Sequence, residues 1–509
     1  MKKITLILIA FLIFISLSAV SASENLTDIS IGDDPSMLES VESVDDVVLS
    51  EETDSIENGS IAQPSTIAAS DVVGYSKFST KVNVTLKSNN TPLAFKPLNI
   101  TINGVSYNRT TDVNGQAIVS VKLATGKYTA DFSFAGDENS TYANGSCKIT
   151  IKDAIKTKIK VADKYINYRQ SLKNAFIVLL VDKNGKPIKN QNVTVKVDGK
   201  VYTAKTDKKG YVEVFLDLKK GKYKVKFSFA KSSPYLSSKG SFKIKVKGPI
   251  AAGDGYWIWS AHMKSVNLKK LSKLGTKHLF LHSNSIYLYG TSSVVNWIAK
   301  AHKYGMEVHI WMQICYSNGK WVRPCNPDDS INYGFLKSKI KEAKKYANIK
   351  GVDGVHFDYV RFGGTAHLYD SSTDAINYFV KKASVKIHKD HPNCIVSAAV
   401  MPEPKMMIYW YGQDIPTMGK YLDVIVPMVY KGNFNKDRGW ITKIVKLYNK
   451  ESKSAVIWAG LQTYHSESNT KKLSHKQLTK DARAAKAGGA TGSILFRYGL
   501  TKFLNFKKV

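Results

Sequence analysis

The clearest candidate for chemistry in this sequence is the carboxylate of Asp358, within the stretch 351–364, which reads GVDGVHFDYVRFGG. The apolar residues predict a buried strand that ends at the closing glycine pair. Period-2 alternation places His356 and Asp358 on one face of this strand and Asp353 on the other. A buried carboxylate is costly without a partner or a purpose. Asp358 could form a structural ion pair with Arg361, or it could be a catalytic carboxylate at the mouth of a barrel.

A second carboxylate, Glu403, follows the next predicted strand in the rigid loop Met401-Pro-Glu-Pro404. Hydrolysis of a glycosidic bond needs two carboxyl groups. We expect Asp358 to be the nucleophile or base, with its pKa lowered by Arg361. We expect Glu403 to be the general acid, with its pKa raised by burial beside aromatic residues. The alternative for Glu403 is an exposed loop residue. Weaker reserve carboxylates are Asp353, Asp370, Asp414 and Glu467.

The C-terminal half, residues 250–509, alternates strand and helix patterns, which predicts an α/β (β/α)8 TIM barrel. The expected strands are Tyr256–Trp259, His278–His282, Glu307–Gln313, Gly354–Arg361, Ile395–Met401, Val424–Tyr430, Ala455–Gln462 and Ser493–Arg497. The expected helices include Val294–Tyr304, Tyr333–Tyr346, Asp374–Lys389, Trp440–Tyr448 and His475–Ala487. A doubly wound sheet is the alternative, but no glycine-rich nucleotide loop follows any strand.

Aromatic and polar residues recur at the carboxyl ends of these strands, where barrel enzymes carry their reacting groups. Aromatic faces stack on sugar rings, whereas amides and guanidinium groups hold hydroxyls. Each residue alone is more often part of a core, but their recurrence favours a carbohydrate site. The predicted substrate-binding residues are Trp257, Trp259, His282, Trp311, Gln313, Arg361, Tyr430, Gln462 and Arg497.

Three motifs in this region resemble those of glycoside-hydrolase-like TIM barrels. They are DGVHFDYVRF at 353–362, GMEVHIW at 305–311 and DVIVPMVY at 423–430. The resemblance spans residues 253–500 and implies a polysaccharide hydrolase with Asp358 as the leading carboxylate. Val360 stands where chitinase-like barrels carry a catalytic Glu, which argues against their substrate-assisted mechanism. Gly363 stands where the group has Pro, so the loop is expected to differ. A nucleophile on strand four with an acid on strand five resembles the α-amylase-like arrangement.

Residues 72–248 contain an internal repeat with a period of about 95 residues. Each copy carries a T-D-x-x-G turn and a G-x-Y-x-x-x-F strand, which predicts two all-β sandwiches, at 71–152 and 153–248. These motifs resemble bacterial Ig-like domains of surface adhesins and invasins. Such domains usually act as spacers, and direct ligand binding is the alternative.

The N-terminus predicts export, because Lys2-Lys3 precede an apolar run from Ile4 to Val20 and then small residues. We expect a signal peptide at 1–22, with an uncleaved membrane anchor as the alternative. Residues 23–70 are acidic and predict a disordered linker. Asn-x-Ser/Thr sequons concentrate before residue 200 and suit an exported, cell-surface protein.

The formal net charge of +33 is unevenly distributed, and basic residues dominate 154–248. Such a field favours acidic partners, for example an anionic wall glycan. A solvated basic surface without a dedicated ligand is the alternative, and no motif indicates nucleic acid. Of the four cysteines, Cys315 and Cys325 could form a disulfide that closes their loop. No metal or organic cofactor is expected.

Together these features predict an exported cell-surface glycosidase that acts on a wall or extracellular polysaccharide. The alternative is a glycan-binding adhesin whose barrel does not cleave its ligand. A peptidase based on Cys394 and scattered histidines has little support in the sequence.

Overall fold

The computed structural model describes residues 62–509. The predicted signal peptide at 1–22 and most of the predicted linker at 23–70 therefore lie outside the described residues. Within 62–509, no helix combines the length and the apolar character needed to cross a membrane.

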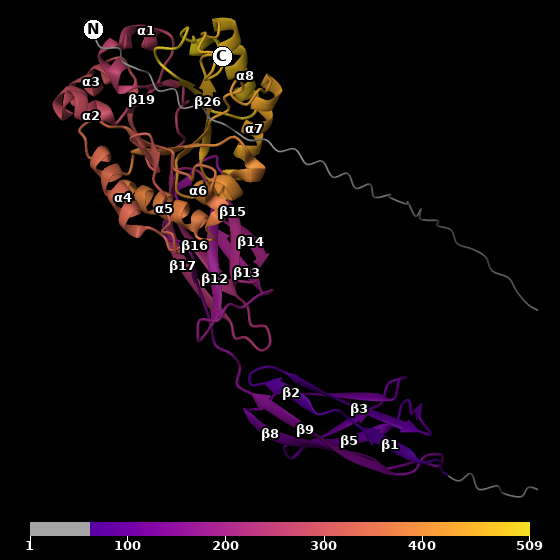
Figure 1. Ribbon diagram of the computed structural model, residues 1–509. Helices are drawn as coiled ribbons and strands as arrows, with labels where there is room; N and C mark the ends of the chain where they lie inside the picture. Colours follow the sequence, from indigo (N-terminus) through magenta and orange to yellow (C-terminus); the bar gives the residue numbers. More distant parts are fainter. Residues whose placement is uncertain (1–61) are drawn as a thin grey trace, which may run out of the picture. The chain divides into compact units, whose positions relative to one another are not determined.

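The first repeat is built from two sheets that share one apolar core (Figure 1). Val84 and Ile100, one from each sheet, are fully buried in that core. One sheet contains β1 (Ser65–Ala68), β3 (Thr80–Ser88), β4 (Thr91–Pro92) and β7 (Gln116–Val121). The other has the order β2 (Val72–Tyr75), β9 (Ala143–Lys152), β8 (Gly126–Phe134), β5 (Pro97–Ile102) and β6 (Val105–Thr110).

The second repeat has the corresponding sheets and a separate core around Val178 and Val195. One sheet has the order β10 (Thr157–Val161), β12 (Asn174–Asp182) and β15 (Tyr211–Leu216). The other has the order β11 (Tyr168–Arg169), β17 (Ser238–Lys247), β16 (Gly221–Phe229), β13 (Asn192–Val197) and β14 (Lys200–Lys205). The matching strand orders show that the sequence repeat is also a repeat of topology.

The T-D-x-x-G motif forms the same turn in both repeats. One carboxylate oxygen of Asp112 accepts hydrogen bonds from the backbone N–H groups of Asn114 and Gln116. Asp207 does the same in the second repeat. The glycine that ends the motif has φ of +69° at Gly115, a conformation that residues with a Cβ rarely adopt.

The C-terminal half forms a closed barrel of eight parallel strands (Figure 1). In order these are β18 (Gly255–Ile258), β19 (His278–His282), β20 (Glu307–Gln313), β23 (Gly354–Asp358), β24 (Ile395–Val400), β25 (Val424–Pro427), β26 (Val456–Gln462) and β27 (Gly492–Phe496). Each strand overlaps the segment expected for it, and β19 and β20 match their predicted bounds.

Helices and short turns surround the barrel. The α-helices are α1 (Leu268–Lys273), α2 (Asn284–Tyr289), α3 (Thr291–Lys303), α4 (Tyr333–Ala347), α5 (Ser372–Asp390), α6 (Ile415–Met418), α7 (Arg438–Glu451) and α8 (His475–Ala487). The other short elements are the hairpin β21 (Tyr316–Ser317) and β22 (Lys320–Trp321), with η1 (Ser260–Ser265), η2 (Ala366–Leu368), η3 (Pro404–Met406), η4 (Met407–Tyr411) and η5 (Phe506–Lys508).

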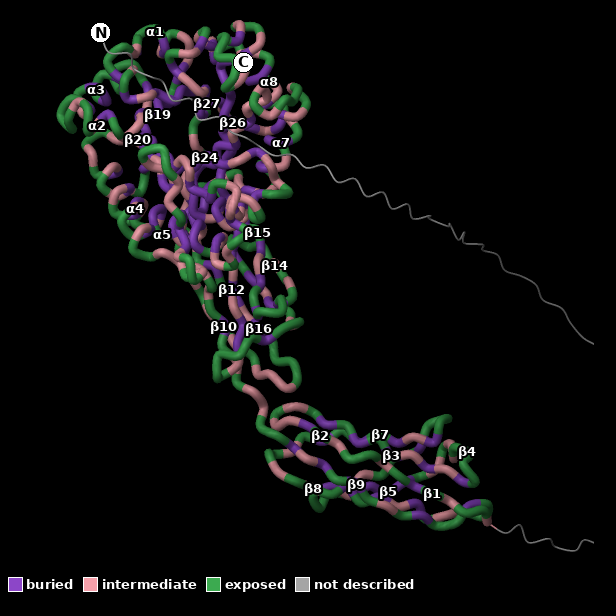
Figure 2. Tube along the Cα trace, viewed as in Figure 1, coloured by how far each residue is buried: buried purple, intermediate pink, exposed green. Residues whose placement is uncertain are grey.

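The barrel strands are buried on both faces, as the continuous buried colour along them shows (Figure 2). Side chains that point inward form one cluster, which includes Trp257, Phe280 and Trp458. Side chains that point outward, such as Phe357 on β23, pack against the helices in a second cluster. His356 contacts Trp257 and Phe280, which confirms that it faces the interior.

The predicted fold class is wrong. We expected two all-β Ig-like sandwiches followed by an α/β (β/α)8 TIM barrel. Each N-terminal repeat includes a parallel strand pair, β2 with β9 and β11 with β17, so neither is an antiparallel Ig sandwich. The C-terminal barrel is all-parallel, but its outer layer is irregular. After β27 the described chain forms only the 3-10 turn η5, and α6 has four residues.

A buried acidic residue, Asp423, organises the amino end of β25. Its two carboxylate oxygens accept hydrogen bonds from Arg169 at 2.5 Å, Asn167 at 2.7 Å, His388 at 2.8 Å and the Val396 N–H at 2.9 Å. Asp423 is fully buried. Burial alone would raise its pKa, but the nearby cations outweigh that effect and hold the pKa of Asp423 well below its usual range.

We predict that Asp423→Asn destabilises the protein by about 3–5 kcal/mol, because it leaves the buried Arg169 guanidinium without its counter-ion. Urea unfolding of the two proteins measures this difference. Asp390→Asn is the control, because it removes a carboxylate from a more exposed ion pair with Lys344. A similar stability change in both variants would contradict the role of Asp423.

The lowered pKa of Asp423 also determines how the stability of the protein changes with pH. Ionised Asp423 contributes stability that is fully present above its unfolded-state pKa of about 3.9 and is lost as pH falls through the lower folded-state pKa. We therefore expect the melting temperature of Asp423→Asn to fall less steeply below about pH 4 than that of the wild type. Parallel slopes would show that other carboxylates dominate acid unfolding.

Candidate active site

Asp358 is the last residue of β23, so its side chain lies at the carboxyl end of the barrel. It is partly exposed. One carboxylate oxygen accepts a hydrogen bond from Trp311 Nε1 at 3.0 Å, and the other accepts one from the Tyr359 N–H at 2.8 Å. Burial raises the pKa of Asp358, although these two hydrogen bonds and the charge of Arg361 act in the opposite direction.

Arg361 does not form the ion pair that the sequence suggested. Within residues 62–509, no ion pair of 4.0 Å or less joins Arg361 to Asp358. The guanidinium is buried and lies over the rings of Trp321 at 4.7 Å, Tyr411 at 5.3 Å and Tyr359 at 5.4 Å. Its charge lowers the pKa of Asp358, as predicted, but desolvation is the larger effect and the net shift is upward.

The chain leaves β23 through a left-handed residue, Tyr359, with φ of +51°. A non-glycine residue in this region is uncommon and carries strain that neighbouring contacts must offset. Here the Tyr359 ring stacks on Tyr316 at 4.7 Å and meets Trp321 edge-on at 5.5 Å. A Cβ at Gly363 would lie 2.7 Å from the Trp321 ring, so glycine at this position makes room for Trp321.

A second aromatic group lies on the strands before β23. The Trp259 ring lies 4.8 Å from His282 and 4.7 Å from Trp311, and the Arg497 guanidinium lies 5.8 Å from the Trp259 ring. Burial lowers the pKa of His282 to about 4, so its imidazole is neutral at ordinary pH. Trp259 and His282 therefore lie against the Trp311 indole that bonds Asp358, and Arg497 lies over Trp259.

The remaining strand ends add polar groups. The half-buried Tyr430 stacks on Phe496 at 5.6 Å. Burial raises the pKa of Tyr430, and the carboxylates of Asp358 and Glu467 raise it further. Gln462 donates a hydrogen bond to Asn433 at 2.8 Å, and Asn433 accepts one from the Glu467 N–H at 3.0 Å. Glu467, the last of the four reserve carboxylates, is therefore held in the loop after β26.

Glu403 lies in the loop after β24 and is partly exposed. Its carboxylate accepts a hydrogen bond from the Tyr411 hydroxyl at 2.6 Å. The Tyr411 ring in turn contacts the Arg361 guanidinium. Glu403 is thus linked to Arg361 through Tyr411.

Two other predictions from the sequence, for Trp257 and for the cysteine pair, differ from the structure. Trp257 is 2% exposed and packs on Phe280 and His356 inside the barrel, so it belongs to the core and not to the rim. The predicted disulfide is not formed, because Cys315 and Cys325 are both free thiols and both buried. Gln313, the last residue of β20, is at a strand end as expected.

Sequence reasoning missed the aromatic wall around Arg361, formed by Trp321, Tyr359 and Tyr411, with Tyr316 stacked on Tyr359. Trp321 and Tyr316 lie in the short hairpin after β20, and no strand-end rule points to such a loop. Tyr359 could have been found, because it directly follows the candidate carboxylate. Asn433 gave no signal in the sequence.

Residues 305–478 match a family model described as "Putative glycosyl hydrolase domain". The match runs from the residues before β20 into α8 and covers about a third of the chain. It includes Asp358, Glu403, Tyr430 and Glu467. This region is therefore similar to a glycosyl hydrolase domain. No curated protein matches the chain.

Several solved structures are similar to parts of the chain. Catalytic domain 2 of the Ostrinia furnacalis group II chitinase is 12% identical with a TM-score of 0.36, over 49% of this chain and 90% of its own. The Clostridium thermocellum CbhA fibronectin(III)-like modules are 14% identical with a TM-score of 0.24, over 36% and 94%. Parabacteroides merdae β-glucuronidase is 10% identical with a TM-score of 0.32, over 84% and 62%. With TM-scores this low, none of these likenesses supports a function.

We predict that Trp311→Phe raises the pKa of Asp358 further, because it removes an N–H donor that favours the carboxylate. Carbon-13 NMR of side-chain carboxyl groups measures the titration, and Asp358→Asn identifies the signal. Trp440→Phe, on the outer helix α7, is the matched control and should leave that signal unchanged. An unchanged Asp358 titration in Trp311→Phe would contradict the prediction.

Proposed function

We propose that the protein is an exported glycoside hydrolase that acts on a wall or extracellular polysaccharide. The carrying observation is Asp358, a partly exposed carboxylate at the carboxyl end of a barrel strand that two hydrogen bonds hold in place. Such strand ends carry the reacting groups of parallel barrels. The match of residues 305–478 to a glycosyl hydrolase family model supports the same reaction class.

In this proposal Asp358 is the nucleophile or base and Glu403 is the general acid. Trp311 and the Tyr359 N–H orient the Asp358 carboxylate. Arg361 lies within range to favour its ionised form, held in place by aromatic rings on several sides. The exposed parts of Trp259, Tyr430 and Arg497 would contact the sugar. The acid would protonate the glycosidic oxygen as the bond to the leaving sugar breaks.

Glu467 competes with Glu403 for the role of acid. The pKa values of both Tyr430 and Tyr359 respond to the charges of Asp358 and Glu467, so these two carboxylates lie near the same pair of tyrosines. Glu403 instead affects Tyr411 and Tyr448. Glu467 is exposed in the loop after β26.

We further propose that the substrate is anionic. The second repeat is rich in lysine: on β16 and β17 the exposed lysines alternate with buried or half-buried residues along each strand. A surface of one sign raises the local concentration of an oppositely charged polymer. A wall glycan that carries carboxylate or phosphate groups fits this surface.

The test is release of reducing ends from a panel of neutral and acidic wall polysaccharides. We expect Asp358→Asn to reduce the rate at least about 100-fold, as is usual for loss of a carboxylate that moves a proton or attacks the substrate. Glu403→Gln and Glu467→Gln identify the acid, because only one of them should match that loss. Asp374→Asn on α5 is the control and should keep full activity.

A non-catalytic adhesin, whose barrel would bind glycan without cleaving it, is the rival function. Polysaccharide binding by the wild type and by Asp358→Asn, with no reducing ends released by either, would support the adhesin and reject the hydrolase.

A further inference from the structure

We propose that His278, Glu307 and His309 form a binding site for a divalent transition-metal ion, of which zinc fits best. His278 is the first residue of β19 and Glu307 is the first residue of β20. These two residues are paired across the neighbouring strands. The group therefore lies at the amino end of the barrel, opposite Asp358, and is independent of the proposed hydrolase.

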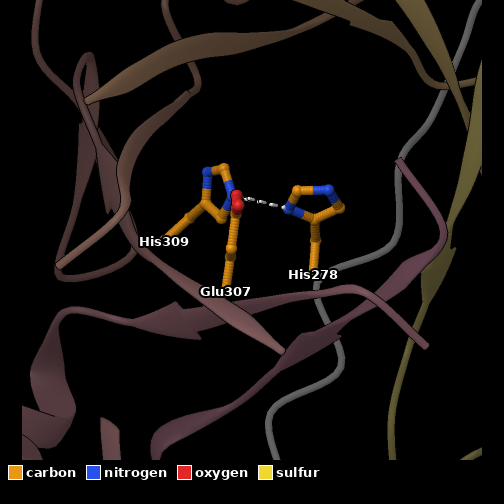
Figure 3. A group of neighbouring side chains, drawn as sticks. All are labelled: His278, Glu307 and His309. Atoms are coloured by element: carbon orange, nitrogen blue, oxygen red, sulfur yellow. Dashed lines mark hydrogen bonds and ion pairs between the residues drawn. The ribbon is translucent and has the colours of Figure 1, made fainter. Parts of the chain in front are cut away.

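The three side chains converge on one point (Figure 3). His278 Nδ1 lies 3.0 Å from His309 Nε2 and 3.4 Å from a Glu307 carboxylate oxygen. All three possible ligand atoms lie within 4.8 Å of one another. A tetrahedral zinc ion with bonds of about 2.0–2.1 Å separates its ligand atoms by about 3.4 Å. Small side-chain movements would bring these atoms into that arrangement.

The donor chemistry selects the class of ion. Two imidazole nitrogens and one carboxylate oxygen form a His₂Glu set, which suits zinc with a water as fourth ligand. Calcium and magnesium prefer oxygen ligands throughout, so they fit this set poorly. The imidazoles are buried, whereas the Glu307 side chain is 46% exposed and gives an ion a route from solvent.

Packing fixes both imidazole rings, which reduces the entropy cost of binding. The His278 ring lies against Trp458, with ring centroids 4.5 Å apart. The His309 ring lies against Gly354, where a Cβ would be 2.1 Å from Nδ1. This contact explains the glycine at the start of β23. His309 Nδ1 is buried and has no hydrogen-bond partner among the described residues.

The competing explanation is a structural hydrogen bond between two neutral imidazoles, with Glu307 as a surface neighbour. That explanation predicts no specific metal binding. The nearby His302, which bonds Asp353 at 2.7 Å and is exposed, offers an ordinary surface histidine for comparison.

Zinc chloride titrated into the full-length chain by isothermal calorimetry provides the test. We expect one tight zinc ion per chain and a zinc-dependent rise in melting temperature, because a ligand that binds only the folded state stabilises it. Glu307→Gln should weaken zinc binding at least tenfold, and His278→Gln should abolish the tight site. His302→Gln is the matched control and should bind as the wild type does.

Cobalt absorption provides a second readout that does not depend on heat signals. Cobalt bound by the wild type should give the intense visible bands of a four-coordinate ion, and Glu307→Gln should lose them. Circular dichroism of each variant confirms folding, and Glu307→Gln changes a partly exposed residue. No zinc binding by the folded wild type, or equal binding by wild type and Glu307→Gln, would overturn the proposal.

Discussion

The buried carboxylate of Asp423 is the constraint on which much of the C-terminal half depends. Four hydrogen bonds converge on its two oxygens, from Arg169 and Asn167 in the second repeat and from His388 and Val396 in the barrel. A buried ion pair stabilises the folded state only when both charges have their partners, because the loss of one partner leaves the other charge buried and unpaired. The sequence motif at 423–430 therefore begins with a residue whose role is to join elements, at the barrel end away from Asp358.

The opposite end of the barrel uses charge differently. Asp358 and Arg361 are close enough to influence each other, yet each is held by neutral groups: Asp358 by an indole and a backbone N–H, Arg361 by aromatic faces. A direct ion pair with Arg361 would occupy the carboxylate oxygens of Asp358. Holding the two charges apart leaves the Asp358 oxygens available to a ligand and keeps the guanidinium in a fixed position. Rigid support of this kind suits the catalytic role that we propose for Asp358.

Sequence periodicity located the barrel strands well, because strands buried on both faces are apolar and are bounded by clear turn residues. The same reasoning identified Asp358, since a carboxylate stands out in such a strand. The same reasoning failed in two other places. The parallel pairing of β2 with β9 in the first repeat depends on long-range contacts that leave no local pattern. The lack of a helix after β27 in the described chain likewise leaves no local pattern.

The side-chain environments were harder to predict. Trp257 sits near a strand end in sequence, but its large ring fills the barrel interior, and only packing decides between these positions. Desolvation of Asp358 likewise depends on Trp311, Tyr359 and their neighbours together, so the direction of its pKa shift could not be inferred from Arg361 alone. The hairpin that supplies Trp321 to the aromatic wall has only four strand residues and no period to detect.

Gly354 and Asp358 mark the two ends of one five-residue strand, β23. At about 3.3 Å per residue they are only about 13 Å apart. The glycine accommodates the His309 ring, and the carboxylate lies at the proposed catalytic end. A side chain at position 354 would displace the backbone of β23. No loop lies between Gly354 and Asp358 that could accommodate this displacement. A substitution at Gly354 is therefore expected to affect both the His309 ring and the position of Asp358.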